Sequence, residues 1–476
     1  MKKRLGDLMR NLFKKFMENF AGAQDMTEGS PMANLLKFAV PLLIGNIAQQ
    51  LYSTVDSIIV GKYVGDKALA AVGASGPLFN LILVLFMGVS VGAGIMISQY
   101  YGAKDRVNLS NTIGTVLTVS LIITVIMMVI GIPIVKPFMR LTNVPDDLFE
   151  MASIYLTIIF AGIIGTVYYN ILSGVLRGMG DSVMPLFYLL FATGLNIVGD
   201  LVLVAGFKMG VAGVAIATIA SQVVSAVLVF IRLRSMTDDF DITKDTLKPR
   251  KFLVERLIKL GLPSGITQGI FSLSMIVVQR LANSFGVSFI AANTVVMRVD
   301  GFAILPVFSF GQAITTYVGQ NVGAGKMDRV RKGCREALKL AGGTTAVLVA
   351  IILIFGKYLM LAFTDTPEVI DMGTTFLRIL AAGYIALAIT NILQGTMRGA
   401  GDTLTPMWLS IVQTVVIRVP LAYAMAALTV TEELPMGDYR IIPLSLLIAW
   451  ILGLLATIFF YKRDKWAKKA GFDKAI

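Results

Sequence analysis

The sequence "NILSGVLRGMGDSVMP" at residues 170–185 returns as "NILQGTMRGAGDTLTP" at residues 391–406. Nine positions, spelling Asn, Ile, Leu, Gly, Arg, Gly, Gly, Asp and Pro, recur in register 221 residues apart. Self-similarity over such a distance indicates two copies of one structural unit. We interpret each copy as a helix end, a turn that needs glycine, and a proline that begins the next helix.

Other stretches pair in the same order. "KFAVPLLIGNIAQQ" from Lys37 matches "KLGLPSGITQGIFS" from Lys259, and "SQYYGAKDR" at 98–106 matches "GQNVGAGKMDR" at 319–329. The sequence therefore predicts two halves, residues 35–233 and 257–461, joined by the charged linker "RSMTDDFDITKDTLKPRK".

The composition places both halves in a membrane. Hydrophobic residues make up 56% of the 476 positions and charged residues only 15%. A bilayer core about 30 Å thick needs roughly 20 mostly apolar helical residues. Such windows lie near 35–60, 70–100, 111–134, 152–176, 184–207, 210–233, 256–284, 289–319, 337–360, 373–397, 405–429 and 441–461.

We therefore expect an all-α membrane protein with twelve transmembrane helices in two six-helix halves. Six is even, so both halves insert with the same orientation, and a pseudo-two-fold axis along the membrane normal should relate them. The predicted domains are an amphipathic segment and linker (1–30), an N-terminal lobe (31–234), a cytoplasmic loop (235–255), a C-terminal lobe (256–462) and a basic cytoplasmic tail (463–476).

The formal net charge of +13 has a topological cause. With the N-terminus placed inside, 31 of the 42 Lys and Arg residues fall in cytoplasmic segments, 7 in outer segments and 4 within helices. This asymmetry is typical of a multi-pass protein of the cytoplasmic membrane with both termini in the cytoplasm. We expect no nucleic-acid partner.

The first twenty residues form a separate feature. In "MKKRLGDLMRNLFKKFMENF" the apolar residues recur at helical spacing and the basic residues take the other face. The pattern predicts a helix on the anionic inner leaflet, or alternatively a regulatory or partner-binding helix.

Several chemistries are excluded. The chain has no histidine and one cysteine, Cys334, so histidine metal sites and internal disulfides cannot form. The stretch "VGQNVGAGKMD" lacks a glycine five residues before Gly325 and has Met327 where a phosphate loop needs Ser or Thr. We expect no enzyme activity, no cofactor and no nucleotide.

Charges within the membrane are costly and are functional candidates. In the first half these are Asp56 and Asp200, with Gln49, Asn196 and Thr218 as polar neighbours. Asp56, Asp200 and Thr218 all fall ~8–12 Å below the outer helix ends at 1.5 Å per residue. Asn196 and Asp200 share a helix face. Oxygen ligands at one depth suit a proton or a sodium ion, although Asp56 and Asp200 could also be interfacial caps.

The second half departs from this pattern. Positions 417 and 421, which align with Asn196 and Asp200, hold Ile and Leu. Its buried polar candidates are instead Arg298, Asp300 and Arg418. A buried Asp300–Arg418 ion pair is one interpretation and substrate contact is the other, since a lone buried charge costs more than a pair.

The chain resembles the multidrug and toxic compound extrusion family. The resemblance rests on "VPLLIGNIAQQLYSTVDSIIVGKYVGDKALAAVG", "QYYGAKD", "SGVLRGMGD", "VGQNVGAGK" and "QGTMRGAGD", which follow one another in the family's order between about residues 30 and 462. It implies that Asp56, Asn196, Asp200 and Thr218 bind the coupling cation and that Pro41 permits a helix bend. Gln49 matches the family more loosely, and the second half offers only Gln268 where the sodium-driven branch has a glutamate.

The resemblance implies a secondary antiporter that exports lipophilic, cationic drugs or metabolites in exchange for H⁺ or Na⁺ by alternating access. The alternative is a flippase of a lipid-linked intermediate, because the wider superfamily shares one scaffold. Its expected partners are membrane lipid and small-molecule substrates, and the expected state is a monomer.

Overall fold

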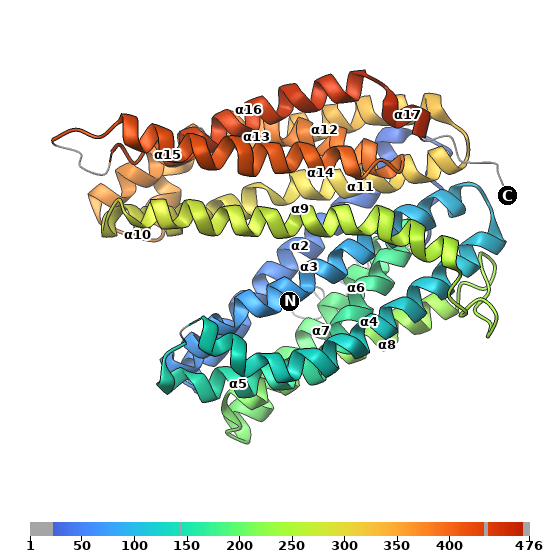
Figure 1. The fold of residues 1–476 in the computed structure, drawn as a ribbon, viewed down its shortest axis with the longest axis horizontal. Helices are drawn as coiled ribbons and strands as arrows, with labels where there is room; N and C mark the ends of the chain where they lie inside the picture. The colour runs from blue at the N-terminus through green and yellow to red at the C-terminus, as the bar shows by residue number, and fades with distance from the viewer. Residues whose placement is uncertain (1–21, 143, 433–436, 470–476) are drawn as a thin grey trace, which may run out of the picture. The chain divides into compact units, whose positions relative to one another are not determined.

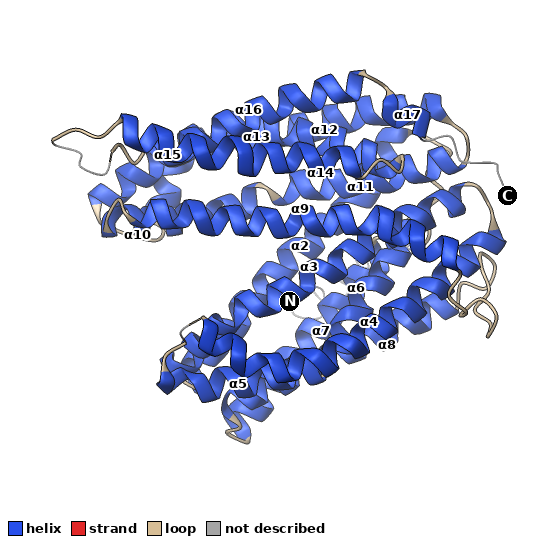
Figure 2. Cartoon of the chain, viewed as in Figure 1, coloured by secondary structure: helices blue, strands red, loops and turns tan. Residues whose placement is uncertain are grey.

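The computed structural model describes residues 22–142, 144–432 and 437–469, and every regular element in them is a helix (Figures 1 and 2). The amphipathic helix predicted for residues 1–20 and the end of the basic tail, 470–476, lie outside the described residues.

The first half contains six spans, two of which are interrupted. They are α2 (Pro31–Tyr63), α3 (Asp66–Gly102), α4 (Arg106–Leu141), α5 (Asp146–Ala161) with α6 (Ile163–Gly178), α7 (Val183–Asp200) with the π-helix η1 (Leu201–Gly206), and α8 (Gly210–Arg234).

The second half repeats this plan. Its spans are α9 (Lys251–Asn283), α10 (Val287–Ala303) with α11 (Leu305–Gly323), α12 (Met327–Leu361), α13 (Pro367–Gly399), α14 (Leu404–Ile411) with the π-helix η2 (Val412–Arg418) and α15 (Val419–Leu428), and α16 (Ile441–Lys462), followed by the short α17 (Lys465–Lys469).

Each predicted membrane window falls on one of these helices or helix pairs, so the expected fold class is confirmed. By length and composition ten described helices can cross a membrane, or eleven with the α5–α6 pair, which is bent by 51°. The 37-residue α3 corresponds to the remaining window. The pseudo-two-fold axis stays a prediction.

Apolar side chains cover the outside of the spans. On α4 the exposed residues include Leu121, Ile122, Val125, Ile126 and Val129, which recur at helical spacing. A water-soluble protein rarely leaves so large an apolar stripe uncovered, whereas lipid tails solvate it well.

The repeated stretch of sequence ends the central helix of each half. In the first half α6 packs against α3 and α8, and in the second half α13 packs against α11, α12 and α16. A Cβ at Gly178 would lie 2.9 Å from the carbonyl oxygen of Gly94, and one at Gly399 would overlap the carbonyl oxygen of Thr315. Glycine at these positions lets two helix backbones touch.

The turns after these helices are equivalent as well. Gly180 and Gly401 adopt φ of 90° and 93°, a region that only glycine enters without strain. Oδ1 of Asp181 then accepts hydrogen bonds from the backbone N–H groups of Val183 and Met184 at 3.2 and 3.0 Å. The repeated stretch is therefore architectural, as the sequence predicted.

The chain forms two compact units that exchange the beginnings of two helices. Unit 1 comprises Met1–Met26 and Val40–Gly265, and unit 2 comprises Thr27–Ala39 and Ile266–Ile476. The start of α2 thus belongs to unit 2 and the start of α9 belongs to unit 1. The lobe bounds predicted from the repeat, 31–234 and 256–462, divide the chain by sequence and stay a prediction.

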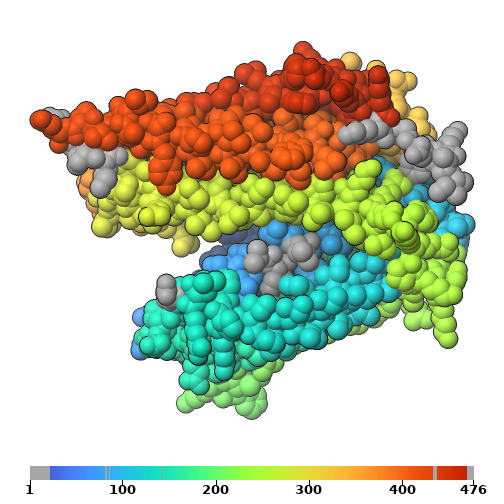
Figure 3. All heavy atoms as spheres, in the orientation of Figure 1, coloured from blue at the N-terminus to red at the C-terminus, as the bar shows by residue number. Residues whose placement is uncertain are grey.

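Close glycine packing holds the start of α9 in unit 1. A Cβ at Gly92 of α3 would lie 2.8 Å from Cα of Gly261, and one at Gly88 would lie 2.8 Å from the carbonyl oxygen of Gly261. The linker before α9 is also fixed, because Thr118 of α4 donates a hydrogen bond of 2.7 Å to the carbonyl of Leu247. Figure 3 shows this linker on the surface as a yellow-green layer beside the blue-cyan end of α4.

Candidate cation site

Two buried polar side chains lie on the same face of α7, towards α8. Asn196 and Asp200 stand one turn apart on α7 and have no exposed surface. Asp200 is the last residue of α7, and η1 begins immediately after it. A π-helical segment shifts the register of the helix by part of a turn, and such segments are frequent at functional sites.

Asn196 connects Asp200 to α8. With its amide oriented to suit its neighbours, Asn196 donates to Oδ2 of Asp200 at 3.3 Å and accepts from the backbone N–H of Thr218 at 3.3 Å. In the other orientation its Nδ2 lies 3.5 Å from Oγ1 of Thr218. Only the first orientation gives both amide atoms a partner, and in it one amide bridges a carboxylate on α7 and a threonine backbone on α8.

Asp56 of α2 completes the cluster. Its half-buried carboxyl group lies within hydrogen-bonding reach of the carboxyl group of Asp200. Oδ1 of Asp56 and Oδ1 of Asp200 are buried, and neither has a hydrogen-bond partner among the described residues. Two neighbouring carboxylates with unsatisfied oxygens need a cation between them, either a proton or a metal ion.

Two tyrosines that sequence reasoning missed also border the cluster. Tyr52 lies one turn before Asp56 on α2, and its hydroxyl lies near the side chain of Thr218. Tyr155 of α5 lies close enough to Asp56 for their charges to interact. Helical spacing from Asp56 could have indicated Tyr52, but no local signal connects residue 155 to this site.

The surroundings of the cluster are apolar. Val60, Val204, Val211 and Val214 are buried beside it on α2, η1 and α8, and Tyr155 packs against them. Within the described residues no group of three or more His, Cys, Asp or Glu side chains could hold a metal ion. A sodium ion would have to draw ligands from the two carboxylates together with Asn196 and Thr218, and those oxygens are the ones that hard cations prefer.

The remaining predicted residues of the first half lie apart from the cluster. Pro41 is buried within α2, two residues after the junction between Ala39 of unit 2 and Val40 of unit 1. The side chain of Gln49 is exposed, and its backbone carbonyl accepts a hydrogen bond from Ser53 at 3.2 Å. A role for Gln49 stays a prediction.

The second half corrects two expectations. Arg298 was predicted to be buried and is exposed on α10. It stands two residues before Asp300, and side chains at that spacing point to opposite sides of a helix. No ion pair within 4.0 Å joins Asp300 to Arg418 among the described residues, although their charges interact. Asp300 is held instead by the hydroxyl of Tyr384, at 2.6 Å.

A cavity of about 490 Å³ opens between α9 and α10 in unit 2. Nε2 of Gln279 donates to Oδ1 of Asn283 at 2.7 Å there, which leaves polar groups beside flexible methionines. The cavity is lined by Met275, Ile276, Gln279, Arg280, Asn283 and Met297.

The comparisons with known proteins agree with this architecture. The family model described as MatE matches residues 41–202 and again residues 263–424. The two matches begin at Pro41 and Pro263, so they reproduce the internal repeat.

Relatives of similar length are named as multidrug resistance proteins. The chain is 30% identical over 453 residues to the probable multidrug resistance protein YoeA of Bacillus subtilis (strain 168), covering 94% of this chain and 96% of that protein. It is 27% identical over 450 residues to the probable multidrug resistance protein NorM of Thermotoga maritima, covering 92% and 93%. A solved structure, described as a crystal structure of MATE in the bent conformation, superposes with a TM-score of 0.87 at 25% identity, covering 94% and 98%.

Proposed function

Because the chain belongs to the multidrug and toxic compound extrusion family, we propose that it is a secondary antiporter that exports lipophilic, cationic compounds in exchange for H⁺ or Na⁺. Membership makes it a multi-pass membrane transporter of small molecules. The direction of transport, the exchange with a cation and the charge of the substrate are the proposed parts.

The observation that carries the proposal is the pair of buried, unpartnered carboxylate oxygens on Asp56 and Asp200. An apolar membrane interior cannot hold both carboxylates charged and uncompensated. A proton or a sodium ion entering from outside satisfies them, and a cationic substrate from inside competes for the same negative charge. Occupancy by one excludes the other, which is the condition for exchange.

Asn196 and Thr218 have a supporting role in this scheme. The amide of Asn196 donates to the carboxylate of Asp200 and accepts from the backbone N–H of Thr218, so it holds that carboxylate against α8. These residues orient the carboxylates and, for sodium, supply further oxygens.

The proposal also includes the location of the protein in the cell and its partners. The excess of Lys and Arg in segments on one side supports a location in the cytoplasmic membrane with both termini inside. We propose a monomer that needs membrane lipid and a coupling ion but no other cofactor and no nucleotide.

A flippase of a lipid-linked intermediate is the second candidate. It is favoured by Arg280, which lines the cavity of unit 2, and by the exposed Arg298, because an anionic headgroup would need unpaired arginines. Flipping of a lipid-linked pyrophosphate in the same vesicles, without export of a lipophilic cation, would favour this candidate.

The test is transport in proteoliposomes with an imposed pH gradient and, separately, an imposed Na⁺ gradient. A fluorescent lipophilic cation should move uphill under one gradient in the wild-type protein. Asp200→Asn and Asp56→Asn should abolish uphill movement while the protein remains folded. Asp146→Asn, which removes an exposed carboxylate at the start of α5, is the matched control. Uphill transport by Asp200→Asn at the wild-type rate would show that the cation binds elsewhere.

A further inference from the structure

The repeated stretches "SQYYGAKDR" and "GQNVGAGKMDR" end in Arg106 and Arg329, and the cation site uses neither. We propose that these two arginines are positioning residues for transport. Each clamps the segment that leads into the first helix of the other half, and so fixes the end from which that helix bends. The inference rests on the proposed transport function, which sets the motion that the clamps would serve.

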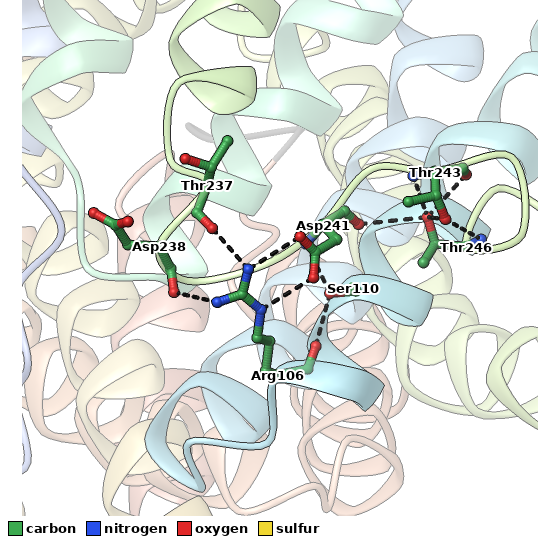
Figure 4. Close-up of polar contacts among 7 residues, drawn as sticks. All are labelled: Arg106, Ser110, Thr237, Asp238, Asp241, Thr243 and Thr246. Atoms are coloured by element: carbon green, nitrogen blue, oxygen red, sulfur yellow. Dashed lines mark hydrogen bonds and ion pairs between the residues drawn. The ribbon is translucent and has the colours of Figure 1, made fainter.

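Arg106 uses its whole guanidinium group on the linker (Figure 4). Its Nη1 donates to the carbonyl oxygen of Asp238 at 2.9 Å, and its Nη2 donates to that of Thr237 at 2.8 Å. Its Nε and Nη2 also donate to the two carboxylate oxygens of Asp241, each at 3.0 Å. A planar fork of fixed donors holds such a set of acceptors in one geometry, which a lysine cannot do.

The next turn of α4 supports this clamp. The backbone N–H of Asp241 donates to Oγ of Ser110 at 2.9 Å, and Ser110 donates to the carbonyl of Arg106 at 2.7 Å (Figure 4). Further along the linker, the backbone N–H of Thr243 donates to Oγ1 of Thr246 at 2.9 Å and closes a local turn. These hydrogen bonds therefore hold the linker in one conformation before it enters α9.

Arg329 makes the equivalent contacts in unit 2. Its Nη1 donates to the carbonyl oxygen of Gly29 and its Nη2 to that of Glu28, each at 3.0 Å. Its Nε donates to Oδ1 of Asn321 at 3.0 Å. In both units the guanidinium group thus holds two consecutive backbone carbonyls and also bonds one further side chain, Asp241 in unit 1 and Asn321 in unit 2.

A lysine strengthens the second clamp. Nζ of Lys326 donates to the carbonyl oxygen of Thr27 at 3.0 Å, directly before the residues that Arg329 holds. Thr27 and the neighbouring Met26 are both buried. The clamped segment ends two residues before α2 begins at Pro31, so little free chain separates the clamp from the helix.

The exchange of helix beginnings between the units indicates which motion the clamps affect, namely the bending of α2 and α9. Thr27–Ala39 belongs to unit 2 while the rest of α2 belongs to unit 1, and α9 changes unit after Gly265. Each helix has a proline within two residues of its junction, Pro41 in α2 and Pro263 in α9. Proline lacks the N–H that would bond the preceding turn, so a helix bends there more easily than elsewhere. A clamped beginning and a weak point at the proline concentrate any motion of the helix at that proline.

The experiment measures helix movement directly, in the full chain reconstituted in nanodiscs. In a Cys334→Ser background, Ser53→Cys on α2 and Ser272→Cys on α9 place reporters at exposed positions beyond each proline. The rate of labelling by a membrane-impermeant maleimide is then compared among clamp variants. Arg329→Ala should change the rate at position 53 at least three-fold and Arg106→Ala the rate at position 272, while Arg329→Lys and Arg106→Lys should recover only part of the wild-type rate.

The matched control is Arg331→Ala, because Arg331 lies on the same helix as Arg329 and pairs with Asp464 at 3.2 Å instead. It should leave both labelling rates unchanged. In proteoliposomes the two alanine variants should lower the maximal transport rate several-fold with less than a two-fold change in KM. Unchanged labelling in Arg329→Ala and Arg106→Ala, or a change equal to that in Arg331→Ala, would overturn the clamp. Absence of cation export by the wild-type protein would overturn the proposed function and leave the labelling result to decide the clamp.

Discussion

Tyr384 donates a hydrogen bond of 2.6 Å from its hydroxyl to Oδ1 of Asp300. Tyr384 is buried on α13 and its ring lies 5.7 Å from that of Trp450, so the hydroxyl cannot turn to solvent. Arg418, at the end of η2, is also buried, and its Nε has no hydrogen-bond partner among the described residues. The charge of Asp300 is therefore satisfied by a phenol, with Arg418 at longer range.

Removing that hydroxyl should destabilise the second half. A hydrogen bond to a charged acceptor contributes about 1.5–3 kcal/mol, and Tyr384→Phe removes this bond from the half-buried carboxyl group of Asp300. We expect a lower unfolding temperature in detergent, measured by intrinsic tryptophan fluorescence. Tyr423→Phe is the control, because Tyr423 is exposed and its hydroxyl donates to the neutral carbonyl of Val277 at 3.2 Å. An equal loss in both variants would contradict the special role of Tyr384.

Backbone contact at the repeated stretch leads to a second prediction. Gly399→Ala would place a methyl group against the carbonyl of Thr315, and overpacking of this kind costs about 1–3 kcal/mol. Gly343→Ala, in the middle of α12, meets nothing within 4 Å and should stabilise the helix by about 0.5–1 kcal/mol. Thermal unfolding of the two variants should therefore shift in opposite directions. If both substitutions raise the unfolding temperature, the α11–α13 contact can relax around the added methyl group.

Acid should release the linker from α4. The hydrogen bonds from Arg106 hold the pKa of Asp241 below its ordinary value of 3.8. A depressed carboxyl pKa contributes stability that is present above the unfolded pKa and is lost as pH falls through the folded pKa. The linker should thus stay docked at about pH 5 and loosen below about pH 3.8.

Pepsin cleavage at Phe240, which is buried while the linker is docked, measures this release. Arg106→Ala should be cleaved over the whole pH range. The ratio of the wild-type cleavage rate to the Arg106→Ala rate should therefore rise as pH falls from about 5 to about 2. Asp245→Asn is the control, since Asp245 forms ion pairs with the exposed Lys248 and Arg250 rather than with Arg106. A constant ratio between wild type and Arg106→Ala across the range would exclude the pH effect.

Much of the fold was predictable because membrane insertion leaves strong marks in sequence. Twenty apolar residues in a row and an excess of lysine and arginine on one side are required by the bilayer itself, whatever the tertiary packing. The offset of 221 residues then placed Gly178 over Gly399 and so predicted equivalent helix ends. The exchange of the beginnings of α2 and α9 was not predictable, since it depends on packing between segments such as Gly92 and Gly261.

The residues of the candidate cation site could be selected from sequence for the same reason. Asp56, Asn196 and Asp200 attract notice because charge and amide are rare inside a membrane. The π-helix η1 directly follows Asp200, and the π-helix η2 ends at Arg418. No residue type in either stretch predicts a π-helix. The role of Tyr384 was not predictable, because a tyrosine in an apolar helix usually packs in the core and only the structure shows its hydroxyl bonded to Asp300.

Asn196→Ala should weaken cation coupling without abolishing it. Asn196 orients the carboxylate of Asp200 but carries no charge, so its removal leaves both carboxylates able to take up a cation. In proteoliposomes the variant should still move a lipophilic cation uphill, at a rate reduced about ten-fold, the effect of roughly 1.4 kcal/mol. Asn170→Ala is the matched control, because the amide of Asn170 donates to the carbonyl of Thr166 in its own helix, at 2.8 Å, and to no carboxylate among the described residues. Loss of all uphill movement in Asn196→Ala, equal to the loss expected in Asp200→Asn, would mean that the amide is itself an essential cation ligand. A wild-type rate would mean that Asp200 needs no orienting partner.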